Sequence, residues 1–306
     1  NRMAEKLVLS RMSVPGVQAK LSVHVERGMN GADRMTLVGL DGNYILKLPS
    51  GMYPELPEAE TIGRALRGAL TGRTITRVEV FAPKMRTPLT PLESAHLEGR
   101  CFVGVRRRAR YLVADLDDGR GLLMHFGMSG VVRVEGAEIP RRKHEHVFIY
   151  LDDGRIFRFE CPRRFSLLEV RDLPSPGRWP EEFAGFGVEP LSEKFCGEYL
   201  YDASRDRKIS AKVLLTDNTV VVGIGNIYSA ETLFAAGVRP DRAASSLSRG
   251  ECRRLAESAV DILRRAIADG GTTISDFRNV DGSEGKFVQH LQIYGRAGEN
   301  CPVCGE

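Results

Sequence analysis

Two carboxylates at the start of an expected helix are the first candidates for chemistry. Residues 54–58 read Pro-Glu-Leu-Pro-Glu, which places Glu55 just before the helix and Glu58 inside its first turn. Proline is common at the first helical positions, and acidic side chains there complement the helix dipole. The spacing alone therefore favours an ordinary helix start, and a catalytic role needs further support.

Three basic groups are candidates for contacts with phosphates. They are Arg106-Arg-Arg-Ala-Arg110 on an expected strand, Arg141-Arg-Lys-His144-Glu-His146, and Pro162-Arg-Arg-Phe165. Guanidinium groups bind phosphate well, although on an edge strand the same charges can serve solubility. An aromatic ring beside two arginines suits insertion into a duplex where a base has left. A loop whose phenylalanine packs into the core is the alternative for Phe165.

The remaining polar motifs are less specific. Residues 222–231 contain a Gly-x-Gly turn before a helix, whose N–H groups can hold a phosphate, but a tight turn without a ligand explains the pattern better. Cys301-x-x-Cys304 is half of a zinc-ribbon ligand set. His125 is expected in the core, unless it has a functional role. His144 and His146 have the spacing of metal ligands on one strand face, although no acidic or cysteine partner is evident nearby.

The composition indicates a globular chain of about two domains. Its 306 residues are 42% hydrophobic and 27% charged, which argues against disorder. The 44 basic and 40 acidic residues leave a net charge of +4, so a polyanionic partner must be argued from local patches. The sequence shows no membrane span or signal peptide, and its six cysteines indicate a reducing, cytosolic setting. A start at Asn1 and an end after a Cys pair lead us to expect a fragment at both ends.

Hydrophobic periodicity predicts the elements that position these motifs. Alternation predicts strands at 21–25 and 44–48, and Ile62, Leu66 and Leu70 predict a helix that ends before Gly72. A capping box at Ser248 begins a second long helix that ends at 270–271. Further strands, joined in part by Asp-Asp-Gly turns at 117–119 and 152–154, are expected at 75–81, 102–105, 111–116, 122–125, 146–151 and 155–160. The pattern predicts an antiparallel sandwich followed by helices.

Taken in order, the motifs resemble those of bacterial formamidopyrimidine-DNA glycosylases over about residues 54–306. The matching segments are Pro54-Glu-Leu-Pro-Glu-Ala-Glu-Thr61, Arg107-Arg-Ala-Arg-Tyr-Leu112, His125-Phe-Gly-Met-Ser-Gly130, Lys143-His-Glu-His146, Pro162-Arg-Arg-Phe165, Val222-Gly-Ile-Gly-Asn-Ile-Tyr228, Gly270-Gly-Thr-Thr273, Gln292-Ile-Tyr-Gly-Arg296 and the Cys pair. The resemblance implies an α+β fold: an N-terminal helix plus an antiparallel β-sandwich, a helix–two-turns–helix domain and a zinc ribbon, truncated here. It also implies removal of oxidised purines such as 8-oxoguanine and formamidopyrimidines from double-stranded DNA, followed by cleavage at the abasic site.

The resemblance assigns catalytic roles to four residues. Pro54 matches an N-terminal proline whose secondary amine attacks the sugar C1′ and forms a Schiff base. Glu55 matches the general acid that helps to open the sugar, and Glu58 matches a supporting carboxylate. Arg110 replaces the family's lysine near the cleaved phosphate; it can hold a phosphate but is a poor proton donor.

Binding roles are assigned in the same way. Met128, Arg163 and Phe165 match residues that fill the gap left by the flipped base. The other DNA-binding positions are His125, His144, Arg207, Lys212 and Asn226. The zinc of the family would take Cys301 and Cys304, which are two of the four ligands it needs. Cys161 and Ser166 replace the Asp and Gly expected around the Arg-Arg-Phe loop.

Residues 1–53 resemble a different family, the N-terminal part of HipA-type serine kinases. The resemblance lies in Ser13-Val-Pro-Gly-Val-Gln-Ala-Lys20 and Tyr44-Ile-Leu-Lys-Leu-Pro49, and it implies that Lys47 faces ATP phosphates under a loop at Gly16. No kinase catalytic-Asp loop or metal-binding segment follows. Both families share the pentapeptide at residues 54–58, where the chain changes character.

This junction conflicts with the chemistry of the implied nucleophile. A nucleophilic amine needs a free lone pair, whereas Pro54 is bonded to Tyr53, so its nitrogen is a tertiary amide. Three explanations stay open: an artificial join at the shared pentapeptide, a genuine fusion that binds DNA without lyase activity, and activation by cleavage between Tyr53 and Pro54.

We therefore predict four parts: a kinase-like fragment at 1–53, the catalytic β-sandwich domain at 54–185, the helix–two-turns–helix domain at 186–287, and the truncated zinc ribbon at 288–306. The predicted function is that of a base-excision repair glycosylase and abasic-site lyase, impaired while Pro54 is internal. The alternatives are a non-catalytic protein of the same fold that binds damaged DNA, and a kinase fragment. We expect a monomer in the bacterial cytoplasm, associated with the nucleoid and not with a membrane.

Overall fold

The chain divides into two compact units, residues 1–51 and 52–306. The computed structural model describes residues 54–89, 92, 96–175, 177–273 and 278–305, together with the backbone of three strands in the first unit. These strands are β1 (Lys20–Glu26), β2 (Arg34–Leu37) and β3 (Tyr44–Lys47), and they form an antiparallel sheet in the order β2-β1-β3. The two predicted strands are confirmed, whereas the side chain of Lys47 and the loop at Gly16 lie outside the described residues. The kinase-like interpretation stays a prediction.

Helix α2 (Leu56–Leu70) opens the second unit at the predicted place. Its start is stabilised by the N–H of Glu55, which donates to Glu58 Oε2 over 2.7 Å; this is one half of a capping box. Ile62, Leu66 and Leu70 are fully buried on the face that packs into the core of the sandwich. The apolar face of α2 thus fixes the helix to the sandwich. The helix also packs against α7 (Arg249–Ala268) in the helical part of the unit.

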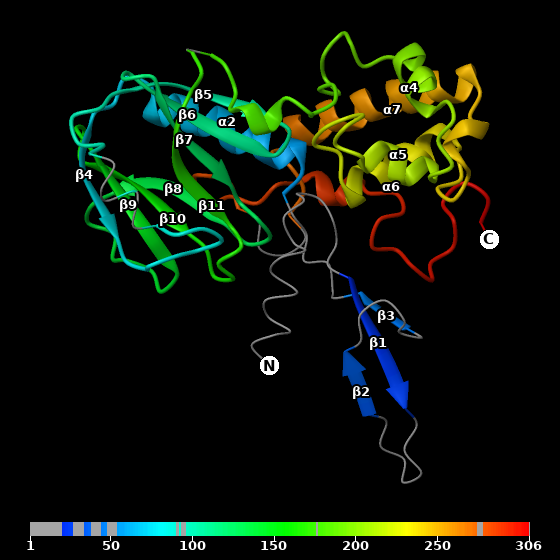
Figure 1. Cartoon of the computed structure of the whole chain (residues 1–306), viewed down its shortest axis with the longest axis horizontal. Coiled ribbons are helices and arrows are strands. Elements are labelled where there is room, and N and C mark those ends of the chain that lie inside the picture. The colour runs from blue at the N-terminus through cyan, green and yellow to red at the C-terminus, as the bar shows by residue number, and fades with distance from the viewer. Residues whose placement is uncertain are drawn as a thin grey trace. The chain divides into compact units, whose positions relative to one another are not determined.

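Two four-stranded antiparallel sheets form the sandwich (Figure 1). Their orders are β4-β9-β10-β8 and β11-β7-β6-β5. The strands are β4 (Ile75–Val80), β5 (Phe102–Arg108), β6 (Tyr111–Leu116), β7 (Arg120–His125), β8 (Val131–Gly136), β9 (Glu145–Leu151), β10 (Arg155–Glu160) and β11 (Leu167–Asp172). The sequence did not predict β8 and β11, because each buries only its first two residues fully and lacks a clear alternation. Every predicted strand is present.

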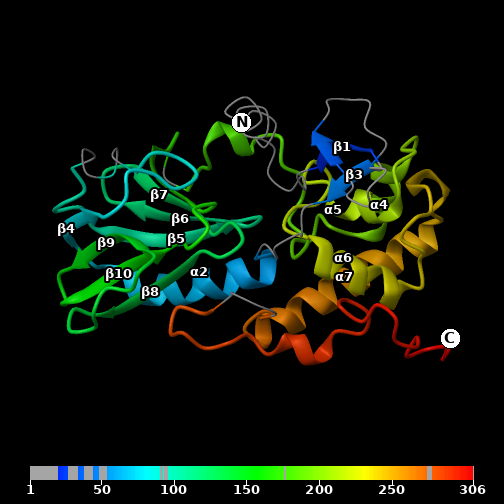
Figure 2. The ribbon, with the colours of Figure 1, turned by 90° about the horizontal axis from the view of Figure 1, so that it is seen from below.

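The rest of the unit is helical and has its own core (Figures 1 and 2). Its longest helix, α7, begins with the predicted capping box at Ser248 and packs against α2, α4 and α6. The elements are η1 (Glu181–Phe183), α4 (Gly197–Ser204), α5 (Ala211–Thr216), α6 (Asn226–Ala236), η2 (Ala244–Ser246), α7 (Arg249–Ala268) and η3 (Phe287–His290). The sandwich core and the helical core are separate hydrophobic clusters, and helix α2 lies where the two parts meet.

Candidate active site

The N-terminus of α6 is occupied by a carboxylate from a distant part of the chain. Glu55 is only 3% exposed, and its Oε2 accepts the N–H of Gly225 over 2.6 Å while its Oε1 accepts the N–H of Ile227 over 2.9 Å. A helix start leaves such N–H groups without intrahelical partners and favours a negative charge. The idea that these N–H groups hold a phosphate is therefore wrong, because an internal carboxylate takes that position.

Glu58 is a second buried carboxylate beside the first. It accepts hydrogen bonds from the N–H of Glu55 at 2.7 Å, from the hydroxyl of Tyr228 at 2.6 Å and from the N–H of Thr272 at 2.7 Å. These donors come from the start of α2, from α6 and from the turn after α7. Tyr228 and Thr272 belong to motifs visible in the sequence, but their types and spacing gave no sign that both would contact one carboxylate.

Burial shifts the protonation of both carboxyls in the same direction. Burial raises the pKa of Glu55 to about 7, although the charge of Arg110 acts to lower it; Glu58 adds a smaller upward push. Burial likewise raises the pKa of Glu58, against the hydrogen bond from Tyr228. A carboxyl whose pKa lies near neutrality can both give and take a proton at physiological pH, which is the property required of a general acid.

Arg110 lies at the same place as Glu55. Its Nη2 donates to the carbonyl of Ile224 over 3.0 Å, and a Cβ on Gly225 would lie 2.4 Å from both Arg110 Nη2 and Glu55 Oε1. Only glycine fits between these two side chains. The buried Nε of Arg110 has no hydrogen-bond partner among the described residues. The structure thus brings Glu55, Glu58 and Arg110 together beside the half-buried Pro54.

The other arginines of strand β5 do not face an external phosphate. Arg107 bridges Glu60 and Glu189, with 2.7 Å between the paired atoms at each end, and Arg108 also reaches Glu189 at 3.3 Å. Arg106 pairs with an aspartate on the neighbouring strand β6 at 2.6 Å. The interpretation of this cluster as four phosphate contacts is wrong for three of them. Their charges instead join the edge strand to α2 and to the segment that enters the helical part.

The Arg-Arg-Phe loop projects outward. Phe165 is 45% exposed, so the alternative in which its ring packs into the core is wrong. Arg163 is also exposed. Cys161 accepts the N–H of Ser166 on its sulfur over 3.4 Å, which is an acceptor role that an aspartate could also fill. The free, buried thiol is therefore a structural part of the loop.

A second loop from the sandwich lies against this one. A Cβ on Gly127 would be 2.7 Å from the carbonyl oxygen of Phe165, and the hydroxyl of Ser166 donates to the carbonyl of Phe126 over 2.7 Å. Met128, which is half-buried, belongs to this second loop. Met128, Arg163 and Phe165 are thus carried by two adjoining loops.

The histidines have structural environments. His125 is buried, and its Nδ1 accepts the N–H of Gly127 over 3.1 Å. Burial lowers the pKa of His125 to about 3, and the nearby charges of Arg110 and Arg86 act in the same direction. His146 Nε2 lies 3.1 Å from the carbonyl oxygen of Cys161, and His144 is half-buried. His125 therefore behaves as a neutral core histidine, which the sequence had left as one alternative.

Three more predicted residues lie in the helical part. Arg207 forms an ion pair with Asp217 at 2.9 Å, Lys212 is half-buried in α5, and Asn226 is exposed at the first position of α6. Asn226 follows directly on the glycine turn that holds Glu55. Because Asp217 already pairs with the guanidinium group of Arg207, a DNA contact by Arg207 would have to compete with this ion pair.

The cysteines near the C-terminus do not form a complete metal site. Cys301 is half-buried and Cys304 is exposed. In the part of the chain that the structure describes, no group of three or more His, Cys, Asp or Glu side chains could hold a metal ion. A closed structural zinc site takes four ligands. The two cysteines therefore do not fit the zinc that the family resemblance implies. Among the described residues, His144 and His146 likewise belong to no group of three or more potential ligands.

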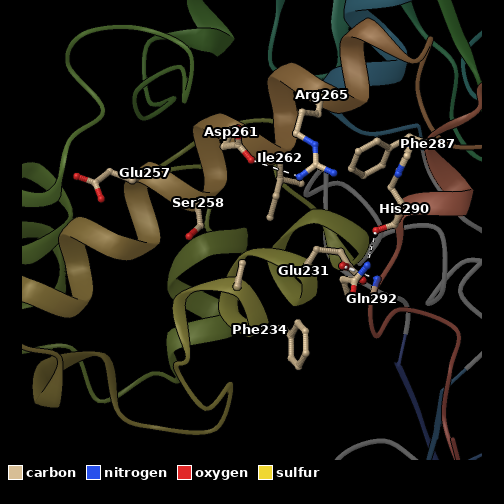
Figure 3. Close-up of a pocket in the computed structure, with 11 residues that line it drawn as sticks. Glu231, Phe234, Glu257, Ser258, Asp261, Ile262, Arg265, Phe287, His290 and Gln292 are labelled. Atoms are coloured by element: carbon tan, nitrogen blue, oxygen red, sulfur yellow. Dashed lines mark hydrogen bonds and ion pairs between the residues drawn. The ribbon is translucent and has the colours of Figure 1, made fainter. Parts of the chain in front are cut away.

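A pocket of about 400 Å³ lies elsewhere in the helical part (Figure 3). The carboxylate of Glu231, at its edge, accepts the N–H groups of Gln292, Ile293 and Tyr294 at 2.8–3.0 Å and so fastens the segment after η3 to α6. Its lining residues are Glu231, Phe234, Ala235, Glu257, Ser258, Asp261, Ile262, Arg265, Phe287, His290 and Gln292. None of the predicted site residues lines it, so the candidate active site rests on the carboxylate pair and not on this cavity.

Comparison with known proteins identifies the family. Residues 53–168 match the formamidopyrimidine-DNA glycosylase N-terminal domain, and residues 186–278 match the H2TH domain of the same enzymes. The chain is 45% identical over 251 residues to the formamidopyrimidine-DNA glycosylase of Thioalkalivibrio sulfidiphilus, which covers 82% of this chain and 92% of that protein. The enzyme of Xanthomonas campestris is 46% identical over 253 residues, with the same coverage.

Solved structures give the same result. A Lactococcus lactis FPG mutant in complex with DNA that contains Fapy-dG superposes with a TM-score of 0.75 at 31% identity, covering 82% of this chain and 92% of that one. MutM in complex with DNA that contains carbocyclic 8-oxo-G gives a TM-score of 0.74 at 32% identity, with the same coverage. The chain belongs to the formamidopyrimidine-DNA glycosylase family, whose members are DNA-repair glycosylases with abasic-site lyase activity. Within the described part of the chain, no helix combines the length and hydropathy that a membrane crossing requires.

Proposed function

We propose that this protein removes oxidised purines, such as 8-oxoguanine and formamidopyrimidines, from double-stranded DNA in the bacterial nucleoid. The observation that carries the proposal is the meeting of Glu55 and Glu58 with Arg110 at the N-terminus of α6. The structural neighbours in complex with DNA that contains Fapy-dG or carbocyclic 8-oxo-G support the choice of substrate.

Each residue of the candidate site has a role that its environment supports. Pro54, once its nitrogen is a free secondary amine, attacks the sugar C1′; the base leaves and a Schiff base forms. Glu55, whose pKa is raised to about 7 by burial, donates a proton as the sugar opens. Glu58 fixes the backbone at Glu55 through its 2.7 Å hydrogen bond. Arg110 holds a phosphate of the DNA without giving up a proton.

The DNA contacts follow the same residues as in the sequence prediction. Met128, Arg163 and Phe165, on two adjoining loops, fill the space left by the flipped base. His125 supports these loops from the core. His144 contacts the DNA from the sandwich and Arg207 from the helical part, where Lys212 and Asn226 contact phosphates.

One observation favours a second candidate, a protein of the same fold that binds damaged DNA without cleaving it. Pro54 is joined to Tyr53 in this chain, and a tertiary amide has no lone pair to offer. Cleavage between Tyr53 and Pro54 would create the free amine that the lyase reaction needs.

Borohydride trapping on a duplex with a single 8-oxoguanine separates these candidates. We expect no covalent adduct with the whole chain and an adduct with a chain that begins at Pro54. A chain that begins at Pro54 and carries Glu55→Gln is the matched control, and it should trap far less. If a folded protein that begins at Pro54 binds the duplex without an adduct, the second candidate is correct. An adduct with the intact chain would show that another amine is the nucleophile.

A further inference from the structure

Tyr228 contacts both carboxylates of the candidate site. Its N–H reaches Glu55 Oε2 at 3.4 Å, and its hydroxyl donates to Glu58 Oε1 at 2.6 Å. The residue is fully buried in the first turn of α6, with its ring 6.1 Å from that of Phe287. A single residue of α6 therefore contacts both carboxylates, Glu55 through its backbone and Glu58 through its side chain.

The Tyr228 oxygen lies within hydrogen-bond distance of both Glu58 and Thr272. A phenol has one proton, and here it is donated to Glu58. The Thr272 hydroxyl, 2.8 Å from the Tyr228 oxygen, must then be the donor in that contact. Every group that contacts the Glu58 carboxylate is thus a donor, which is the arrangement suited to an ionised carboxylate.

The protonation state of Glu58 affects how the backbone next to Pro54 is held. The Glu58 carboxyl accepts the N–H of Glu55 at 2.7 Å, and Glu55 is the residue that follows the proline. Loss of the Tyr228 hydroxyl would leave Glu58 with two donors instead of three and would favour its protonated form. A protonated carboxyl has lost its negative charge and is a weaker acceptor than a carboxylate, so its hold on the N–H of Glu55 would weaken.

We propose that Tyr228 is a positioning residue for the glycosylase reaction: through Glu58 it fixes the backbone of Glu55 and hence the place of the Pro54 nitrogen. Its hydroxyl acts through Glu58 and donates no proton in the reaction. This inference rests on the proposed function for its catalytic readout, but its structural step can be measured without any reaction. The ionisable groups that face Glu58 and Tyr228 are Glu55 and, beyond it, Arg110.

The structural step is tested on the whole chain by titrating the glutamate side-chain carboxyl carbons by NMR. In Tyr228→Phe we expect the pKa of Glu58 to rise by about one unit, because a donor to the charged form is lost. Tyr199→Phe is the matched control, since the Tyr199 hydroxyl donates to the carbonyl of Val220 at 2.7 Å and not to a carboxylate. Thr272→Val, which keeps the Thr272 N–H, should give a smaller rise. An unchanged Glu58 titration in a folded Tyr228→Phe protein would overturn the inference.

The catalytic step is tested by single-turnover release of 8-oxoguanine from a duplex by the chain that begins at Pro54. This length corresponds to 92% of a complete relative. We expect Tyr228→Phe to be about tenfold slower near neutral pH, with the acid limb of its pH–rate profile moved upward by about one unit and duplex affinity within about twofold of the parent. Tyr199→Phe should match the parent. An equal loss of rate and affinity, or an unmoved profile, would count against a positioning role; an inactive parent would count against the proposed function alone, because the NMR titration still decides the inference.

Discussion

The stability of the protein should depend on pH through Glu55. Burial raises the pKa of Glu55 to about 7 from an ordinary value of 4.5. The folded state therefore binds this proton more tightly than the unfolded chain does. The contribution of this bound proton to the stability of the folded state is complete below pH 4.5 and is lost as the pH rises through about 7. A shift of about 2.5 units corresponds to about 3 kcal/mol of unfolding free energy.

Replacing Glu55 with Gln removes this titration. We expect the difference in unfolding free energy between the parent and Glu55→Gln to change by about 3 kcal/mol from pH 4.5 to pH 8, with the parent losing the more stability. In both proteins the unfolding free energy should still fall somewhat with rising pH, because the pKa of Glu58 is raised in the same direction. The absolute stabilities are less informative, since an amide cannot accept all the N–H groups at the start of α6.

Urea unfolding followed by tryptophan fluorescence measures this difference. The chain has one tryptophan, Trp179, which contacts Phe183 in the second unit, so the signal reports on the unit that holds Glu55. Glu60→Gln is a control in which the pH dependence of the unfolding free energy should change in the opposite direction. Burial acts to raise the pKa of Glu60, but Arg107 and Arg64 outweigh it and hold that pKa below its usual range, so Glu60 stabilises at higher pH. Parallel loss of stability in the parent and Glu55→Gln would refute the assignment of the pH dependence to Glu55.

Two further predictions concern the exposed loop at 162–165. Phe165→Ala should leave the melting temperature nearly unchanged, because the residue is 45% exposed. It should slow 8-oxoguanine release by about tenfold, since one of the three side chains that fill the gap in the duplex is lost; a variant as fast as the parent would exclude that role. Arg163→Ala should reduce the slope of log affinity against log salt concentration by about 1, because one phosphate contact is lost, and an unchanged slope would place Arg163 outside the DNA contact.

Local sequence signals were enough for much of the fold. The start of α2 follows from prolines and acidic residues in one short segment, and the capping box at Ser248 marks the start of α7. Apolar alternation located six strands of the sandwich, because hydrophobic residues must face its core. The two missed strands, β8 and β11, bury too few residues to show that alternation. Such features depend on residues that are close together in the chain.

Only the tertiary structure decided which of these residues meet. Glu55 and Gly225 are separated by 170 positions, and no local pattern indicates that a glutamate would supply the acceptor for the N–H groups of α6. Arg107 and Arg110 look alike in the sequence, yet one is held by two glutamates and the other lies beside Glu55. Partner choice of this kind depends on how the sandwich, α2 and the helical part pack. The sequence could thus determine the residue types of the site, whereas packing determined which charges are neutralised and which are left for chemistry.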